Sequence, residues 1–197
     1  MLASEQFNLG KARALVVDGN PQALDILCGV LTAFGLREIV RKMDGKQAQA
    51  ELLAHSFDLI LVDGQTPQMD GYDLIRWLRH DAAETIRMTP AIVVTAHTPR
   101  AKVVLARDCG ANFVIAKPIS PSVVLERILW VARSDRMFVE CDVFIGPDRR
   151  WKHAGPPIEN PDGRRRNDKP AEIGLPEGGN LSQSELDELI TPQKMAG

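Results

Sequence analysis

Short runs of branched apolar residues recur along the first two thirds of this chain, and none of them is long enough to form a helix. The clearest runs cover residues 13–17, 58–62, 91–95 and 112–116, and a weaker one covers residues 38–42. Because each run is apolar at consecutive positions, we expect strands that are buried on both faces. Five such strands predict a five-stranded parallel sheet.

Amphipathic stretches between these runs predict the helices that connect the strands. Apolar residues at positions 24, 27, 31 and 34 recur at helical spacing after Pro21, which suits a first helical turn. Further helices are expected over residues 46–55, 73–80, 100–108 and 121–132, and Gly35 and Gly110 fit helix ends. The alternation predicts an α/β fold class, a doubly wound sheet flanked by helices on both faces.

The composition changes near Ser134 and divides the chain. Residues 134–197 hold seven of the 13 prolines and seven of the 15 glycines, which is the composition of a tail rather than of a second core. We therefore expect an N-terminal extension over residues 1–10 and a folded domain over residues 11–133. A mostly irregular Pro/Gly-rich linker or tail would follow over residues 134–180, with a short amphipathic helix over residues 181–191.

The charge balance argues against two classes of partner. Lys and Arg number 24 against 26 Asp and Glu, so a net charge of -2 gives no electrostatic reason to bind nucleic acid or an anionic membrane. No segment approaches 18 uninterrupted apolar residues, and the N-terminus has no signal-sequence pattern. We expect a cytoplasmic protein that contacts neither nucleic acid nor membrane.

Polar side chains stand at the carboxyl ends of four expected strands. Asp18, Asp63, Thr95 and Lys117 end the first, third, fourth and fifth strand respectively. In a parallel sheet these ends share one edge, where ligands of open α/β sheets bind. Two carboxylates suit Mg²⁺, and a lysine beside them can neutralise phosphoryl oxygens while a carboxylate attacks phosphorus. The pattern predicts a phosphoryl-transfer site.

Residues 11–133 resemble the receiver domain of two-component response regulators, the family of the single-domain chemotaxis regulator, which has a flavodoxin-like fold. The resemblance lies in Val16-Val17-Asp18, the run from Asp63 to Gly71, Val94-Thr95-Ala96, Gly110-Ala111 and Ala116-Lys117-Pro118, in that order. It implies Asp63 as phosphoacceptor, Asp18, Asp63 and the Gln65 backbone carbonyl as Mg²⁺ ligands, Thr95 as switch hydroxyl and Lys117 as phosphate partner. It also implies a cis Lys117-Pro118 bond.

Two positions depart from the pattern of this family. Gly19 stands where the family usually has a second acidic residue after the first strand, so Mg²⁺ affinity is expected to be reduced. Val114 stands where the family usually carries an aromatic residue that turns inward on activation. Phe113 is adjacent, but strand alternation points it to the other face. The usual coupling between Thr95 and an aromatic side chain is therefore not expected.

The last segment is well specified as a short helix. Ser182 and Glu185 are spaced as a capping box, and Leu181 and Leu186 as a hydrophobic staple. Leu186, Leu189 and Ile190 form one apolar strip. A helix this short is marginal alone in water, because stable isolated helices need about 12 residues. It is expected to fold against a partner surface.

This segment also resembles the N-terminal peptide of the flagellar motor switch protein, which docks on phosphorylated chemotaxis receivers. Positions 181–183, 185, 187 and 189 match its Leu-Ser-Gln-x-Glu-Ile-Asp-x-Leu pattern, with Leu186 in place of isoleucine. The resemblance implies a partner-binding element whose contacts come from Leu181, Glu185, Leu186, Leu189 and Ile190. The alternative is an ordinary amphipathic helix that docks on its own domain.

The leading hypothesis is a stand-alone response regulator that accepts a phosphoryl group on Asp63 from a histidine kinase or phosphotransfer protein. It would signal by protein contact, and it would be no enzyme beyond assisting its own phosphorylation and dephosphorylation. The helix over residues 181–191 would bind another receiver or its own receiver face. The alternative is a pseudo-receiver adaptor that binds partners independently of phosphorylation, with Gly19 and Val114 in its favour.

Overall fold

A five-stranded parallel sheet forms the centre of the molecule, as the sequence predicts. The structure is a computed structural model that describes residues 9–133, 138–141, 144–148 and 180–190. The sheet order is β2-β1-β3-β4-β5. These strands are β1 (Arg13–Val17), β2 (Glu38–Lys42), β3 (Leu59–Val62), β4 (Ala91–Thr95) and β5 (Phe113–Ala116). β3 and β4 are buried at every position, which explains their uninterrupted apolar sequence.

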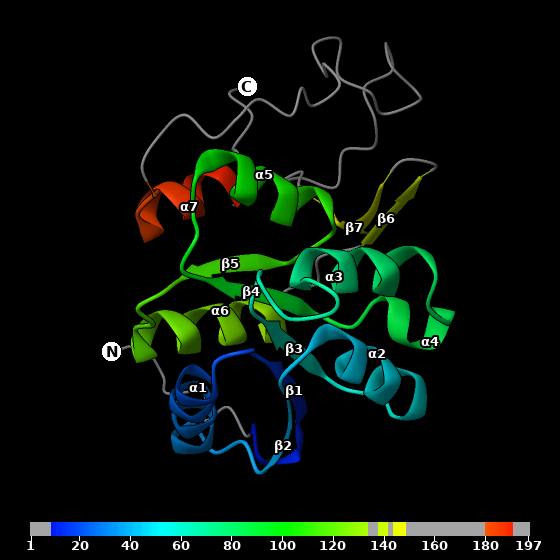
Figure 1. The fold of residues 1–197 in the computed structure, drawn as a ribbon, viewed down its shortest axis with the longest axis horizontal. Coiled ribbons are helices and arrows are strands. Elements are labelled where there is room, and N and C mark those ends of the chain that lie inside the picture. Colours follow the sequence, from blue (N-terminus) through cyan, green and yellow to red (C-terminus); the bar gives the residue numbers. More distant parts are fainter. Residues whose placement is uncertain (1–8, 134–137, 142–143, 149–179, 191–197) are drawn as a thin grey trace, which may run out of the picture.

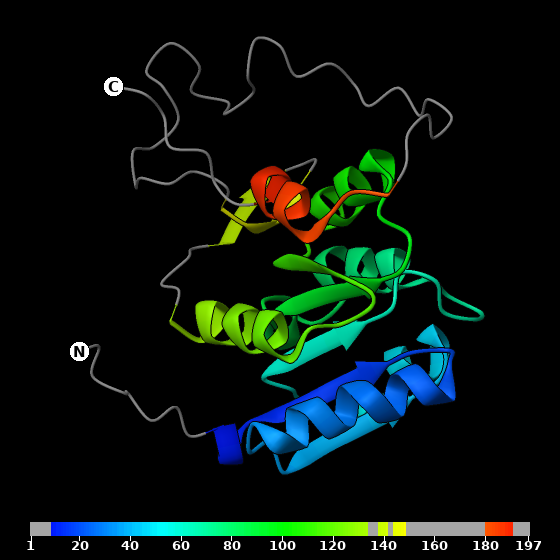
Figure 2. The same cartoon turned by 90° about the vertical axis from the view of Figure 1, so that its left-hand side faces the viewer.

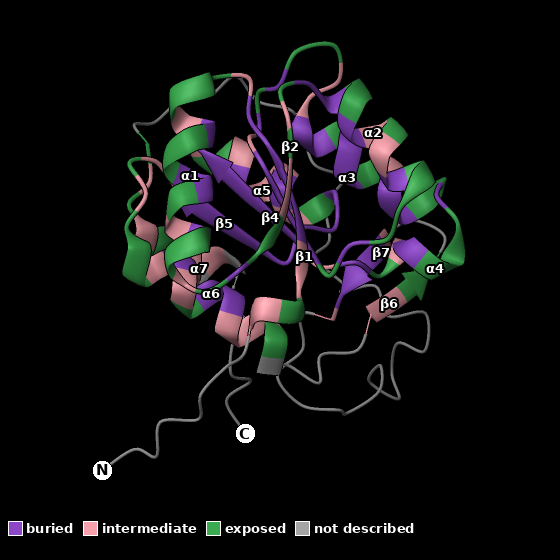
Figure 3. Ribbon diagram, turned by 90° about the horizontal axis from the view of Figure 1, so that it is seen from below, coloured by how far each residue is buried: buried purple, intermediate pink, exposed green. Residues whose placement is uncertain are grey.

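Helices cover both faces of this sheet, with α1 and α6 on one face and α2 and α3 on the other (Figure 1, Figure 3). The bounds are η1 (Leu9–Lys11), α1 (Pro21–Ala33), α2 (Gly45–Ala54), α3 (Gly71–His80), α4 (Glu84–Arg87), α5 (Arg100–Asp108) and α6 (Pro121–Arg133). The four-residue α4 was not expected from the sequence. None of the helices in the described part of the chain is long and apolar enough to cross a bilayer.

Local signals explain where the helices begin and end. Pro21 opens α1, and the Asn20 side chain caps it by accepting hydrogen bonds from the backbone N–H groups of Gln22 and Ala23. Gly35 and Gly110 follow α1 and α5 with φ of 92° and 94°, a left-handed conformation that favours glycine. The helix ends expected at these glycines are therefore confirmed.

Part of the segment expected to be linker instead folds onto the domain. β6 (Phe138–Cys141) and β7 (Phe144–Pro147) form an antiparallel hairpin. Gly146 and Pro147 of β7 pair with Val139 and Phe138 of β6. An ion pair of 2.8 Å between Arg87 of α4 and Glu140 of β6 holds the hairpin to the domain. Residues 149–179, which carry most of the expected linker, lie outside the described residues.

A second C-terminal element, α7 (Gln183–Ile190), lies beside α5 and against β5 (Figure 1, Figure 2). The expected capping box is present: the Ser182 backbone N–H donates to a Glu185 carboxylate oxygen at 2.7 Å. The Ser182 hydroxyl reaches the same oxygen at 2.7 Å. These hydrogen bonds lower the pKa of Glu185. The cap formed by Ser182 and Glu185 therefore fixes the start of α7 through residues of the helix's own sequence.

The buried guanidinium of Arg79 ties α3 to the hairpin and to the turn before β5. Arg79 is fully buried, and its Nε and Nη1 donate to the carbonyls of Gly110 at 3.1 Å and Thr89 at 2.9 Å. Its Nη1 also donates to the Arg87 carbonyl, and the guanidinium carbon lies 4.9 Å from the centre of the Phe138 ring. Burial lowers the pKa of Arg79 to about 10. The partners of the Arg79 guanidinium named here are thus backbone carbonyl oxygens and not a carboxylate.

Replacing Arg79 should destabilise the fold strongly. The change Arg79→Met leaves several buried carbonyls without a donor, so we expect the free energy of unfolding to fall by roughly 3 kcal/mol. The matched control is Arg76→Met on the same helix, where Arg76 is half-exposed and pairs with Asp73. That control should cost less than about 1 kcal/mol. Urea denaturation of both variants measures the difference, and equal losses would contradict the role given to Arg79.

Candidate functional site

The four polar residues predicted at strand ends come together at one edge of the sheet. Asp18 and Asp63 directly follow β1 and β3, Thr95 ends β4 and Lys117 directly follows β5. Backbone hydrogen bonds continue the sheet at this edge, from Asp63 N–H to the Val17 carbonyl at 2.8 Å and from Lys117 N–H to the Thr95 carbonyl at 2.9 Å. The sheet order therefore places the two carboxylates on adjacent strands, with the hydroxyl and the ammonium on the next two.

The Lys117 ammonium joins the two carboxylates. Its Nζ donates to Oδ2 of Asp18 at 2.7 Å and to Oδ2 of Asp63 at 3.0 Å. Burial alone would lower the pKa of Lys117, but the hydrogen bonds and negative charges of Asp18 and Asp63 outweigh it and raise the pKa. Lys117 therefore stays charged at neutral pH. The Lys117-Pro118 peptide is cis, as the resemblance implied.

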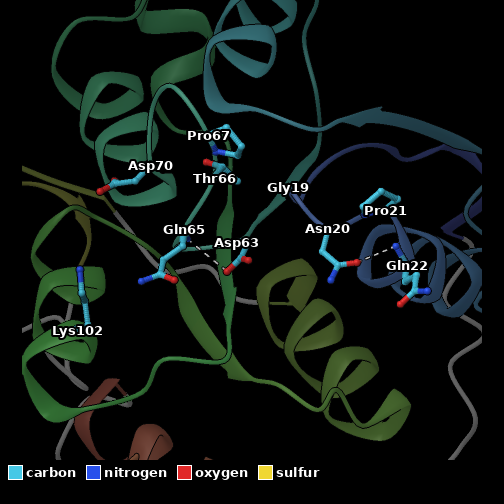
Figure 4. A pocket seen from close by; sticks show the side chains of 11 residues that line it. Gly19, Asn20, Pro21, Gln22, Asp63, Gln65, Thr66, Pro67, Asp70 and Lys102 are labelled. Carbon is cyan, nitrogen blue, oxygen red and sulfur yellow. Dashed lines mark hydrogen bonds between the residues drawn. The ribbon is translucent and has the colours of Figure 1, made fainter.

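Solvent reaches this edge through an open cleft of about 960 Å³. Figure 4 shows Asp63 at its centre, between the loop after β1 and the loop after β3. The lining includes Gly19, Asn20, Gln65, Pro67 and Lys102. Asp18 lies deeper and is 2% exposed, whereas the Asp63 side chain is 15% exposed. Of the two carboxylates, Asp63 is the one that an incoming group can reach.

The oxygen donors around the cleft suit a hard divalent cation. Asp18 and Asp63 supply carboxylates, and Gln65, whose N–H lies 3.4 Å from Oδ1 of Asp63, brings a backbone carbonyl to the same rim. Gly19 adds no side chain, and a Cβ built there would lie only 2.9 Å from Cδ of Pro67. Within the described ranges, no three His, Cys, Asp or Glu side chains gather at one point. The donor set fits Mg²⁺ with one carboxylate fewer than the family usually has.

Thr95 has an aromatic neighbour that was not expected from the sequence. Tyr72 of α3 is 1% exposed, and its hydroxyl lies near enough to the Thr95 side chain for Thr95 to lower its pKa. Its Oη would lie 2.5 Å from a Cβ built at Gly64, so the glycine after Asp63 leaves the space that the ring occupies. Burial raises the pKa of Tyr72 to about 12 and outweighs the lowering influence of Thr95. The aromatic neighbour of Thr95 therefore comes from α3 and not from β5, where the chain has Val114.

Phe113 points away from the site, as strand alternation predicts. Its ring packs edge-on against Trp130 of α6, with ring centres 4.7 Å apart.

Thr95 also accepts a hydrogen bond of 3.1 Å from the His97 backbone N–H. The signal for Tyr72 in the sequence was weak: it is the one tyrosine of the chain, at the start of a helix.

The expected partner-binding residues lie away from the cleft, on the face formed by α5, β5 and α6. Leu186 is fully buried, and Leu181 and Leu189 pack partly buried against the same core. Glu185 is exposed and belongs to the cap of α7. The side chain of Ile190 lies outside the described residues. Asp63, Thr95 and Lys117 thus form one group and the α7 residues another.

This sheet order, with acid and lysine at its carboxyl edge, defines the receiver class of two-component signalling proteins. The family model described as response regulator receiver domain matches residues 14–129, so the chain belongs to that family. The chemotaxis protein CheY of Pseudomonas aeruginosa is 30% identical over 116 residues, which cover 59% of this chain and 92% of that protein.

Other relatives place the same domain in different proteins. The DNA-binding response regulator MtrA of Mycolicibacterium smegmatis is 34% identical over 118 residues, which cover 60% of this chain and only 49% of MtrA. The receiver domain of the sensor histidine kinase PA1611 from Pseudomonas aeruginosa is 28% identical with a TM-score of 0.56, covering 61% of this chain and 98% of that one. That crystal structure is described with a magnesium ion coordinated in the active site cleft.

The environment of Tyr72 can be tested by titration, because the chain has one tyrosine. In the folded protein, tyrosinate absorbance should rise with a midpoint at about pH 12, read after a rapid pH jump before the chain unfolds. In urea the midpoint should fall to about pH 10. The folded state holds this proton more tightly, so the stability from Tyr72 is complete below about pH 10 and is lost as pH rises through about 12. A native midpoint near the urea value would contradict the burial of the hydroxyl.

Proposed function

We propose that this protein is a stand-alone response regulator that is phosphorylated on Asp63 and signals by protein contact. The observation that supports this most is the Lys117 ammonium, which bridges Asp18 and Asp63, and Asp63 lines an open cleft. The donor would be a histidine kinase or a phosphotransfer protein. The receiver family model over residues 14–129 and the match to CheY support a role in two-component signalling. Its place of action would be the cytoplasm.

The residues of the site suit transfer from a phosphohistidine. A carboxylate oxygen of Asp63 would attack phosphorus and form the new P–O bond, while the P–N bond breaks and the imidazole leaves with the electron pair and takes up a proton. The Lys117 ammonium would keep a hydrogen bond to the Asp63 carboxylate or to the phosphoryl group, and it would neutralise the negative charge there. The Thr95 hydroxyl would donate a hydrogen bond to a phosphoryl oxygen. The chain would thus catalyse only its own phosphorylation and dephosphorylation.

Mg²⁺ would be held by Asp18, Asp63 and the Gln65 carbonyl, and it would supply positive charge beside the phosphoryl oxygens. Mg²⁺ keeps several water ligands and needs few protein ones, so the missing side chain at Gly19 weakens this site without abolishing it. The magnesium described in the PA1611 receiver supports this assignment.

Phosphorylation at Asp63 is tested with acetyl phosphate and Mg²⁺, followed by mass spectrometry. The wild-type chain should gain one phosphoryl group and Asp63→Asn none, because an amide is not a nucleophile at phosphorus. The matched control Asp58→Asn lies at the opposite end of β3, where the Asp58 carboxylate accepts from the Arg13 N–H, and should label like the wild type. If neither acetyl phosphate nor a cognate kinase gives an Asp63-dependent adduct, the proposed function is wrong.

The metal assignment predicts a gain of affinity from one substitution. Gly19→Asp restores a second acidic residue after β1 and should tighten Mg²⁺ binding roughly tenfold in a calorimetric titration, because ligand charge sets affinity. Gly19→Asn is the matched control, since it meets the Pro67 ring in the same way without adding charge. Equal affinity of the two variants would show that Asp18 and Asp63 already saturate the charge requirement and that Gly19 weakens nothing.

A second candidate is an adaptor that binds partners independently of phosphorylation. It is favoured by Gly19 and by the resemblance of residues 181–189 to a receiver-binding peptide. On this proposal Leu181, Glu185, Leu186, Leu189 and Ile190 would contact another receiver or the chain's own receiver face. The adaptor predicts that Asp63→Asn leaves partner binding intact, whereas the response regulator predicts that Asp63→Asn abolishes its dependence on phosphate.

A further inference from the structure

The helix α7 covers the open edge of the sheet. β5 is the last strand, so the backbone groups on its outer side have no neighbouring strand. The side-chain amide of Gln183 takes the place of one: its Oε1 accepts from the Ala116 N–H at 2.9 Å, and its Nε2 donates to the Val114 carbonyl at 3.1 Å. A single glutamine thus pairs with two backbone groups of the edge strand.

Packing and charge hold α7 against the same face. The Leu186 side chain is 0% exposed and belongs to the hydrophobic core of the domain. Asp187 forms an ion pair with Arg127 of α6, which is itself 9% exposed. Asp187 also accepts from Nε2 of Gln183 at 2.9 Å, which fixes the orientation of the glutamine amide. The helix is therefore docked through specific polar contacts as well as through apolar burial.

The residues before α7 bind the loop that begins at Thr95. The Leu181 N–H donates to the Thr98 carbonyl at 2.9 Å, and the Thr98 hydroxyl donates to the Leu181 carbonyl at 2.8 Å. The Asn180 side chain accepts from the Thr98 N–H at 3.2 Å and donates to the Ala96 carbonyl at 3.3 Å. Four hydrogen bonds therefore attach the start of the α7 segment to residues 96 and 98.

These contacts lie next to the two residues that would touch a phosphoryl group. Ala96 and Thr98 follow Thr95 by one and three positions, and Ala116 and Val114 precede Lys117 by one and three. Lys117 already contacts Asp63, whereas the Thr95 hydroxyl accepts a hydrogen bond from the His97 N–H and lies near the Tyr72 hydroxyl. A phosphoryl group on Asp63 that binds the Thr95 hydroxyl would shift Thr95, and the adjoining hydrogen bonds from Ala96 and Thr98 to Asn180 and Leu181 would be strained by that shift.

We propose that α7 is an intramolecular latch that covers the face of α5, β5 and α6 in the resting state and is released when Asp63 is phosphorylated. The proposal rests on the proposed function, since it needs Asp63 to carry the phosphoryl group. Coupling between two sites is reciprocal. If the phosphoryl group weakens α7 docking by a certain factor, docked α7 therefore weakens phosphoryl binding by the same factor.

The test uses the full chain with Mg²⁺ and beryllofluoride, which mimics the aspartyl phosphate. Hydrogen exchange of the amides in residues 183–190 should accelerate when beryllofluoride binds, while exchange in β1 should not. In a separate titration, Leu186→Asp should bind beryllofluoride roughly tenfold more tightly than the wild type, because it removes the docked helix. A second variant covers the case in which Leu186→Asp perturbs the core. Gln183→Ala keeps the apolar contacts of α7 and should shift the beryllofluoride affinity in the same direction. Ser184→Ala, at an exposed position of the same helix, is the matched control and should leave it unchanged.

The outcomes separate this proposal from the one it rests on. Asp63-dependent beryllofluoride binding with equal affinity in the wild type and both variants would overturn the latch and leave the response regulator intact. Slower exchange of α7 in the presence of beryllofluoride would also overturn it, because the helix would then favour the phosphorylated state. Absence of beryllofluoride binding in every variant, together with absence of Asp63 labelling, would overturn both proposals.

Discussion

Burial of the parallel strands on both faces is the constraint on which the rest of the structure depends. β1, β3 and β4 lie between two layers of helices and can carry almost no polar side chain along their length. Polar groups are confined to the points where strands end. Since parallel strands end at the same edge, Asp18, Asp63, Thr95 and Lys117 are brought together by the sheet itself. The site is a direct result of the topology rather than of a separate binding loop.

The charges at this edge balance one another. Two carboxylates on adjacent strands repel, and the Lys117 ammonium between them offsets that repulsion at hydrogen-bond distance. The same contact holds the Asp63 carboxylate at the cleft, which it lines. Thr95 is held by a different device: Gly64 leaves a space that the Tyr72 ring fills, and its hydroxyl reaches Thr95 from α3. The aromatic neighbour of Thr95 therefore comes from another element than Val114.

Two C-terminal elements extend the receiver fold by covering surface that it would otherwise expose. The β6-β7 hairpin packs near α3, where Arg79 contacts the Phe138 ring and the turn at Gly110. The helix α7 covers the edge of β5 through Gln183 and Leu186. The hairpin is held by the Arg87–Glu140 ion pair and the contact between Arg79 and Phe138, whereas the α7 segment donates hydrogen bonds to backbone carbonyls of the domain. The second of them contacts the residues beside Thr95 and Lys117, so it alone is placed to sense the cleft.

The sequence by itself determined the sheet, the helix boundaries near Pro21 and Gly35, the capping box of α7 and the four strand-end residues. These features follow from periodicity and from interactions between residues a few positions apart, so a short stretch of sequence is enough to predict them. Only the tertiary structure decided that Tyr72 meets Thr95, that Arg79 is solvated by carbonyls, and that Gln183 pairs with β5. Each of these joins residues far apart in sequence, and no local pattern encodes which distant group a polar side chain will satisfy. For the same reason the α7 sequence specified a helix that must dock, but the surface it covers came from the fold.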